Sequence, residues 1–156
     1  MELKDLKSQY NVLTRKYKLP TFKEVNEIFE IDRIERDTDC ILREVRKAMM
    51  DKIISYIRLV EMMLNPAQAP PMFMMFVKSI SDGDRKVMEE VYKNFIELEL
   101  RSLKLEIDYA EEDEAKAIKH IIDVWHETEP SLRSLIGIME KNWNSKSEKK
   151  EKAYFG

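Results

Sequence analysis

Glycine, cysteine and histidine are scarce in this 156-residue chain, and each scarcity excludes a class of functional site. The three glycines, Gly83, Gly137 and Gly156, lie far apart, so no glycine-rich loop can cradle a phosphate or a dinucleotide. The single cysteine, Cys40, excludes a disulfide framework and cysteine-rich zinc sites. The two histidines are too few for a three-histidine metal centre.

Long apolar runs are also missing. The longest fully apolar run, Met72–Val77, is much shorter than the roughly 20 residues that a membrane helix needs. The N-terminal stretch MELKDLKSQY contains acidic residues and lacks the apolar region of a signal peptide. We therefore expect a cytoplasmic protein with no membrane partner.

The overall composition is that of a protein that folds in water, with 37% charged and 44% hydrophobic residues. The net charge of −3 is unevenly distributed along the chain. Residues 1–23 hold six basic and two acidic residues, residues 97–114 hold two basic and eight acidic ones, and residues 141–152 hold five basic and two acidic ones. Two basic ends therefore flank an acidic middle, which keeps binding to nucleic acid open as an alternative.

The apolar residues follow a helical period along most of the chain. In the first segment they are spaced by three and four residues, at Leu3, Leu6, Tyr10, Leu13 and Tyr17. Pro20 ends that helix, because the residue before a proline avoids the helical conformation. Thr21 and Glu24 then have the spacing of a capping box, which predicts the start of a short second helix.

The strongest helical pattern runs from about residue 38 to residue 64. Its inner stripe consists of Leu42, Val45, Met49, Ile53, Tyr56, Val60 and Met63. We expect the charged residues Arg43, Glu44, Arg46 and Lys47 to lie outside this stripe. The second half is apolar on more than one face, as in a central helix that is touched from two sides.

A further helix is predicted over residues 82–109, because Ser81 and Asp84 form a second capping-box pattern. Residues 103–109 alternate strictly between apolar and charged or polar side chains, which is also the pattern of a half-buried strand. No second alternating segment exists to pair with such a strand, and leucine, lysine and glutamate favour helices. We predict a helix here and keep the strand as an alternative.

The last patterned segment begins near Glu112. Its inner positions are Ile118, Ile122, Trp125, Glu129, Leu132, Ile136, Met139 and Trp143, and Pro130 within it predicts two helices or one kinked helix. Residues 144–152 contain no apolar side chain. We expect an all-α fold, an irregular antiparallel bundle of about five or six helices. Residues 1–143 would form a single helical domain, and residues 144–156 a flexible charged tail.

Few residues are arranged for chemistry. His120, Asp123 and Glu127 share one helix face and could supply one nitrogen and two oxygens to a metal ion, but we favour a solvated helix surface, where such residues are common. The acids of residues 106–114 have no matching pair for a magnesium site, and Cys40 has no histidine near it in sequence. We assign no catalytic, cofactor-binding or metal-binding residue and expect no cofactor.

The methionines are the most unusual feature, since eight of the ten lie between residues 49 and 88. Methionine is flexible and fills irregular cores or lines adaptable binding surfaces. A helix over residues 72–77 would have no polar face and must be covered by the protein's own core or by a partner. The predicted protein-binding residues are therefore Met72, Phe73, Met74, Met75, Phe76 and Val77.

These patterns favour a non-enzymatic helical protein that acts through protein–protein interaction, as an adaptor or assembly factor. We expect it to associate with itself, for instance as a homodimer, through residues 72–77 or the seam from Ile118 to Trp143. One alternative is a small RNA- or ribosome-associated protein that uses its basic ends. Another is a metal-dependent helical hydrolase built around His120, Asp123 and Glu127.

Overall fold

The computed structural model describes residues 2–35 and 37–155 of the chain, with side-chain surroundings as far as Lys146. Every regular element in this part is helical, which confirms the all-α bundle. The α-helices are α1 (Leu3–Tyr17), α2 (Phe22–Phe29), α3 (Ile41–Leu64), α4 (Pro71–Val77), α5 (Asp82–Ile107) and α6 (Glu111–Phe155). Two 3₁₀ turns, η1 (Ile31–Arg33) and η2 (Pro66–Gln68), flank α3.

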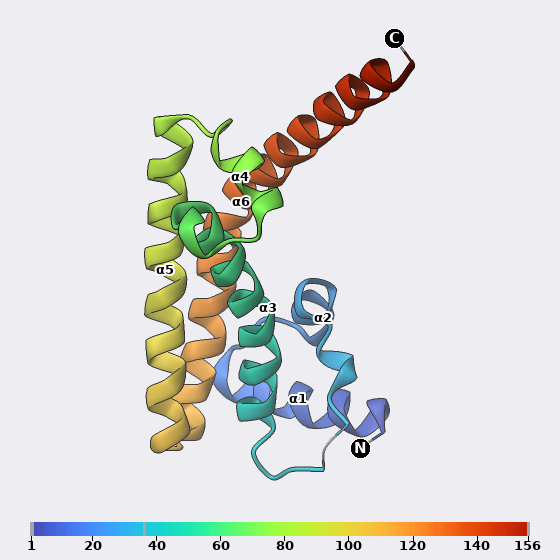
Figure 1. Ribbon diagram of the computed structural model, residues 1–156. Coiled ribbons are helices and arrows are strands. Elements are labelled where there is room, and N and C mark those ends of the chain that lie inside the picture. The colour runs from blue at the N-terminus through green and yellow to red at the C-terminus, as the bar shows by residue number, and fades with distance from the viewer. Residues whose placement is uncertain (1, 36, 156) are drawn as a thin grey trace.

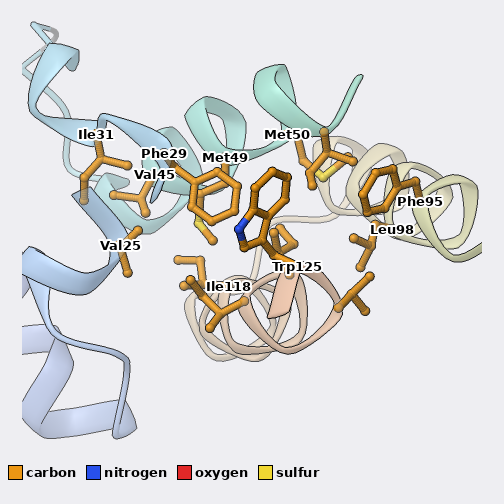
Figure 2. Packing of buried hydrophobic residues seen from close by; sticks show 14 of the residues in the cluster. Val25, Phe29, Ile31, Val45, Met49, Met50, Phe95, Leu98, Ile118 and Trp125 are labelled. Atoms are coloured by element: carbon orange, nitrogen blue, oxygen red, sulfur yellow. The ribbon is translucent and has the colours of Figure 1, made fainter. Parts of the chain in front are cut away.

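The three long helices α3, α5 and α6 form the body of the molecule, and α5 runs antiparallel to the other two (Figure 1). Their facing stripes bury side chains such as Met49, Phe95 and Ile118, each fully inaccessible to solvent. Trp125 of α6 lies among residues of α2, α3 and α5 (Figure 2). The apolar period of each long helix therefore marks the face that it turns to the other two.

The N-terminal helices α1 and α2 pack against the lower part of α3 (Figure 1). The buried Tyr10 hydroxyl donates a hydrogen bond to the Pro20 carbonyl at 3.0 Å, which holds the turn between the two helices. Thr21 caps α2 by accepting a hydrogen bond from the Glu24 amide at 3.2 Å. The Phe29 ring then packs edge-on against Trp125 at 5.6 Å between centroids, so α2 is fastened to α6 as well.

The boundaries of α5 settle the one ambiguous segment. The Ser81 side chain and the Asp84 carboxylate make both hydrogen bonds of the predicted capping box. The helix continues to Ile107, so the strand alternative is wrong over residues 103–107. A single strand would leave its backbone groups without partners, whereas the helix satisfies them internally.

Helix α6 is a single element that includes Pro130, and its ribbon changes direction between its orange and red parts (Figure 1). Of the two readings offered for Pro130, the structure selects one continuous helix with a bend. The backbone stays helical from Asn144 to Phe155, in the stretch predicted as a flexible tail. Lysine and glutamate favour helices, which explains regular structure in so polar a sequence. The flexibility of the tail and the domain boundary at residue 143 stay predictions.

Candidate functional site

The methionine- and phenylalanine-rich segment forms α4, which packs against α3 and α6. Phe76 is buried, and Phe73, Met75 and Val77 are half-buried against the core. Met72 and Met74 remain 52% and 40% exposed. The six predicted residues therefore divide between the protein's own core and its surface, and the fold alone does not cover all of them.

An apolar groove of about 470 Å³ lies beside α4, where α3, α4 and α6 meet. Its apolar lining residues are Leu59, Phe76, Ile136, Met139 and Trp143, and its polar ones are Glu140 and Asn144. Trp143 is 49% exposed. The groove therefore contains one residue of the segment 72–77 and the last three positions of the Ile118–Trp143 seam. The sequence patterns suggested these as two separate candidate surfaces.

The lower part of that seam has a different role. Ile118, Ile122, Trp125 and Leu132 are all buried in the protein's own core. These four side chains are at most 6% exposed, so they offer little apolar surface to a partner. The apolar residues of the seam that are half-buried or exposed are those from Ile136 onward, which narrows the surface that the sequence suggested.

A buried ion network connects α3 to α5 and α6, and the sequence reading missed it. Arg46, expected outside the inner stripe, is only 1% exposed, so that expectation is wrong. Its Nε donates to Glu114 Oε2 at 2.5 Å, its Nη2 donates to Glu106 Oε1 at 2.5 Å, and its Nη1 donates to the Ser102 hydroxyl. Glu114 is fully buried. The sequence signal for this network was an acidic cluster at residues 106–114 together with a basic cluster at the start of α3. Only the fold shows that the two clusters are in contact.

Neighbouring charges complete this network. The Arg43 guanidinium lies 4.7 Å over the Tyr109 ring, and its Nε is 3.6 Å from Glu114 Oε1. Lys47 Nζ is 3.3 Å from Glu106 Oε2. Burial opposes the charge on Arg46, but its hydrogen bonds to Glu114 and Glu106 leave the pKa of Arg46 above its ordinary value.

The hydrogen bond from Arg46, together with that from Lys47, holds the pKa of Glu106 below its ordinary value. The basic cluster at the start of α3 is thus compensated by carboxylates of the same chain. Charges that are neutralised in this way have little attraction left for phosphate. We therefore interpret the network as a structural link between α3, α5 and α6 and not as a binding site for an anion.

The three residues considered for a metal centre, His120, Asp123 and Glu127, are exposed on α6. The described residues contain no grouping of three or more histidine, cysteine, aspartate or glutamate side chains placed to hold a metal ion. Cys40 is half-buried at the start of α3, with a free thiol. The exposure of His120, Asp123 and Glu127 supports the interpretation that they belong to a solvated helix surface.

Comparison of the chain with protein-family models, with curated proteins and with solved structures finds no match. Within the residues that the structure describes, none of the helices is both long enough and apolar enough to span a bilayer.

Proposed function

We propose that the chain is a non-enzymatic helical protein of the cytoplasm that binds other proteins, including a second copy of itself. The observation that supports this proposal is the apolar groove between α3, α4 and α6, which is lined by the half-exposed Trp143. Met72 and Met74 of α4 add exposed apolar surface on the helix that contributes Phe76 to the groove. Tryptophan and methionine are enriched where proteins bind each other.

The occupant that fits this groove is an amphipathic helix of a partner protein. Ile136, Met139 and Trp143 are spaced by three and four residues, so they form one wall along a single face of α6. Apolar anchors of a bound helix repeat at the same spacing and interdigitate with such a wall. The Met139 side chain adapts to the shape of the bound helix at little cost.

Site-specific photocrosslinking in the source cell tests this proposal. A photoreactive residue at Met72 is expected to give one defined protein adduct, and the same residue at Val12, which is 63% exposed on α1, gives none. The purified partner should bind the wild-type chain at least tenfold more tightly than Trp143→Asp. Identical adducts at Met72 and Val12, or equal affinities, would contradict the proposal.

The two alternatives have less support. Lys16 and Lys23 of the basic N-terminal region lie near Glu111 and Glu27 of the same chain, at 2.8 and 3.6 Å. Binding to RNA or the ribosome stays a prediction that a steep salt dependence of RNA binding would support. A metal-dependent hydrolase would need further ligands around His120, Asp123 and Glu127, and the described residues provide no such grouping.

A further inference from the structure

Helix α5 presents a second apolar row on the side that faces away from the core. Leu100, Leu103 and Ile107 are 62%, 56% and 82% exposed, and Ile96 next to them is half-buried. The four residues are spaced by four, three and four, so they lie above one another on one face. At 100° per residue this face is opposite to the buried side chains of Phe95, Leu98 and Leu105.

Nothing in the described part of the chain covers Leu100, Leu103 and Ile107, because α5 forms one edge of the bundle (Figure 1), whereas Ile96 at the end of the row is half-buried against the core. Single exposed apolar residues are common on soluble proteins. A continuous row at the heptad spacing of a helix–helix seam is different, especially in a chain with 37% charged residues. The row has the pattern of a contact surface.

We propose that this row packs against the same row of a second copy, with the two α5 helices antiparallel and the two-fold axis between Leu100 and Leu103. This inference names the face used in the self-association that forms part of the proposed function. It involves none of the residues that line the groove at α4. A two-fold contact requires a surface that is complementary to itself, and the row meets this requirement.

The charges around the row favour the antiparallel arrangement. Glu89 and Lys93 continue the same row toward the start of α5. A parallel pair would place each of them against its own copy, and like charges in direct contact are unfavourable. In the antiparallel pair they lie beyond the paired segment, while Ile96 faces Ile107 and Leu100 faces Leu103 of the second copy.

The same arrangement brings opposite charges together on one flank of the row. Glu97 lies opposite Lys104 of the second copy, and the two-fold axis produces this pair twice. Neither side chain has an ion-pair partner in its own chain among the described residues. On the other flank Glu99 approaches Glu106 of the second copy, but Arg46 and Lys47 already compensate the charge of Glu106.

Sedimentation equilibrium over a range of concentrations tests the contact. The wild-type chain is expected to form a reversible dimer, since the row spans fewer than two heptads. Leu103→Lys should weaken dimerisation at least tenfold, whereas Val12→Lys on α1 leaves it unchanged. Thermal unfolding equal to that of the wild-type chain, at a concentration where both are monomeric, verifies the fold of the variant. A wild-type chain that stays monomeric, or a Leu103→Lys variant that still dimerises fully, would overturn the proposal.

Three further measurements separate this face and orientation from the alternatives. Lys104→Glu should weaken the dimer, and the double exchange Glu97→Lys with Lys104→Glu should restore it. In a Cys40→Ser background, a mixture of Ile96→Cys and Ile107→Cys chains should form a mixed disulfide, and Ile96→Cys alone should form none. Crosslinking of Ile96→Cys with itself would overturn the antiparallel arrangement.

The Trp143→Asp variant separates the α5 contact from the groove at α4. It should keep the dimer intact, so a dimer that dissociates in this variant would overturn the α5 contact. A variant that still dimerises but no longer binds the partner protein would affect only the proposal for the groove.

Discussion

At the scale of single residues, the pair of Arg46 and Glu114 shows how a buried charge depends on its partner. The Arg46 side chain is 1% exposed and the Glu114 side chain is fully buried. Removing one member of such a pair leaves the other charge in the interior without compensation. Replacing both members by apolar side chains costs much less, because no charge is then left unpaired.

We predict that Arg46→Met lowers the free energy of unfolding by about 3–5 kcal/mol, since it leaves Glu114 buried without its main partner. Urea denaturation monitored by circular dichroism measures this change. Arg133→Met is the matched control: Arg133 forms an exposed ion pair with Glu129, and its loss costs at most about 1 kcal/mol.

The double variant Arg46→Met with Glu114→Leu distinguishes an unpaired charge from lost packing as the cause. It is expected to be more stable than Arg46→Met alone. A double variant as unstable as the sum of the two single changes would show that the buried glutamate is not the reason.

At the scale of helices and turns, local sequence signals placed the boundaries of α3 and α5 within about three residues. The capping box of Ser81 and Asp84 marks the first turn of α5 because both partners lie within four residues of each other. The alternating pattern over residues 103–107 suggested a strand, but a strand depends on a pairing partner elsewhere in the chain. The helical backbone of α6 beyond residue 143 could not be read from the sequence, because a polar helix has no apolar period to reveal it.

Gly137 provides a prediction at this scale, because it lies in the interior of α6 and is exposed to solvent. A Cβ atom added there would meet nothing within 4 Å. Gly137→Ala should therefore raise the free energy of unfolding by about 0.5–1 kcal/mol, since alanine loses less backbone entropy in a helix.

Thermal or urea unfolding of the Gly137→Ala variant measures the gain. Gly83→Ala serves for comparison: it lies in the first turn of α5, and its added Cβ would make an ordinary contact at 3.7 Å with the Ser81 hydroxyl. We expect a smaller gain there, because the helix end contributes less to stability. A loss of stability in Gly137→Ala would indicate that the glycine is needed for the bend of α6.

At the scale of the whole molecule, polar contacts connect the end of α1 to the end of the bundle where α6 begins. Lys16 Nζ and the Tyr17 hydroxyl donate to Glu111 Oε1 at 2.8 and 2.7 Å. Lys119 Nζ donates to the Tyr17 carbonyl at 3.0 Å. The hydrogen bond from Lys16, with that from Tyr17, holds the pKa of Glu111 below its ordinary value of 4.5.

We predict that the chain loses stability in acid. Glu111 and Glu106 both have lowered pKa values in the folded state, so they bind protons less tightly there than in the unfolded chain. Their contribution to stability is complete above about pH 4.5 and is lost as the pH falls through the folded pKa values. Urea midpoints between pH 7 and pH 3 measure this dependence.

Glu111→Gln tests the origin of the acid sensitivity. The variant should be less stable than the wild-type chain at pH 7, and its stability should decrease less steeply below pH 4.5 because one of the responsible carboxylates is gone. Stability curves of the same shape for the two proteins would show that Glu111 does not contribute.

The amino-acid sequence by itself determined the all-α class and the positions of the long helices. The reason is that helical periodicity and capping depend on residues within a few positions of each other. Only the tertiary structure decided that Arg46 is buried, that Phe76 and Trp143 line one groove, and that Leu100, Leu103 and Ile107 stay on the surface. Burial depends on which elements pack together, and several packings satisfy the same helical pattern, so these outcomes required the fold.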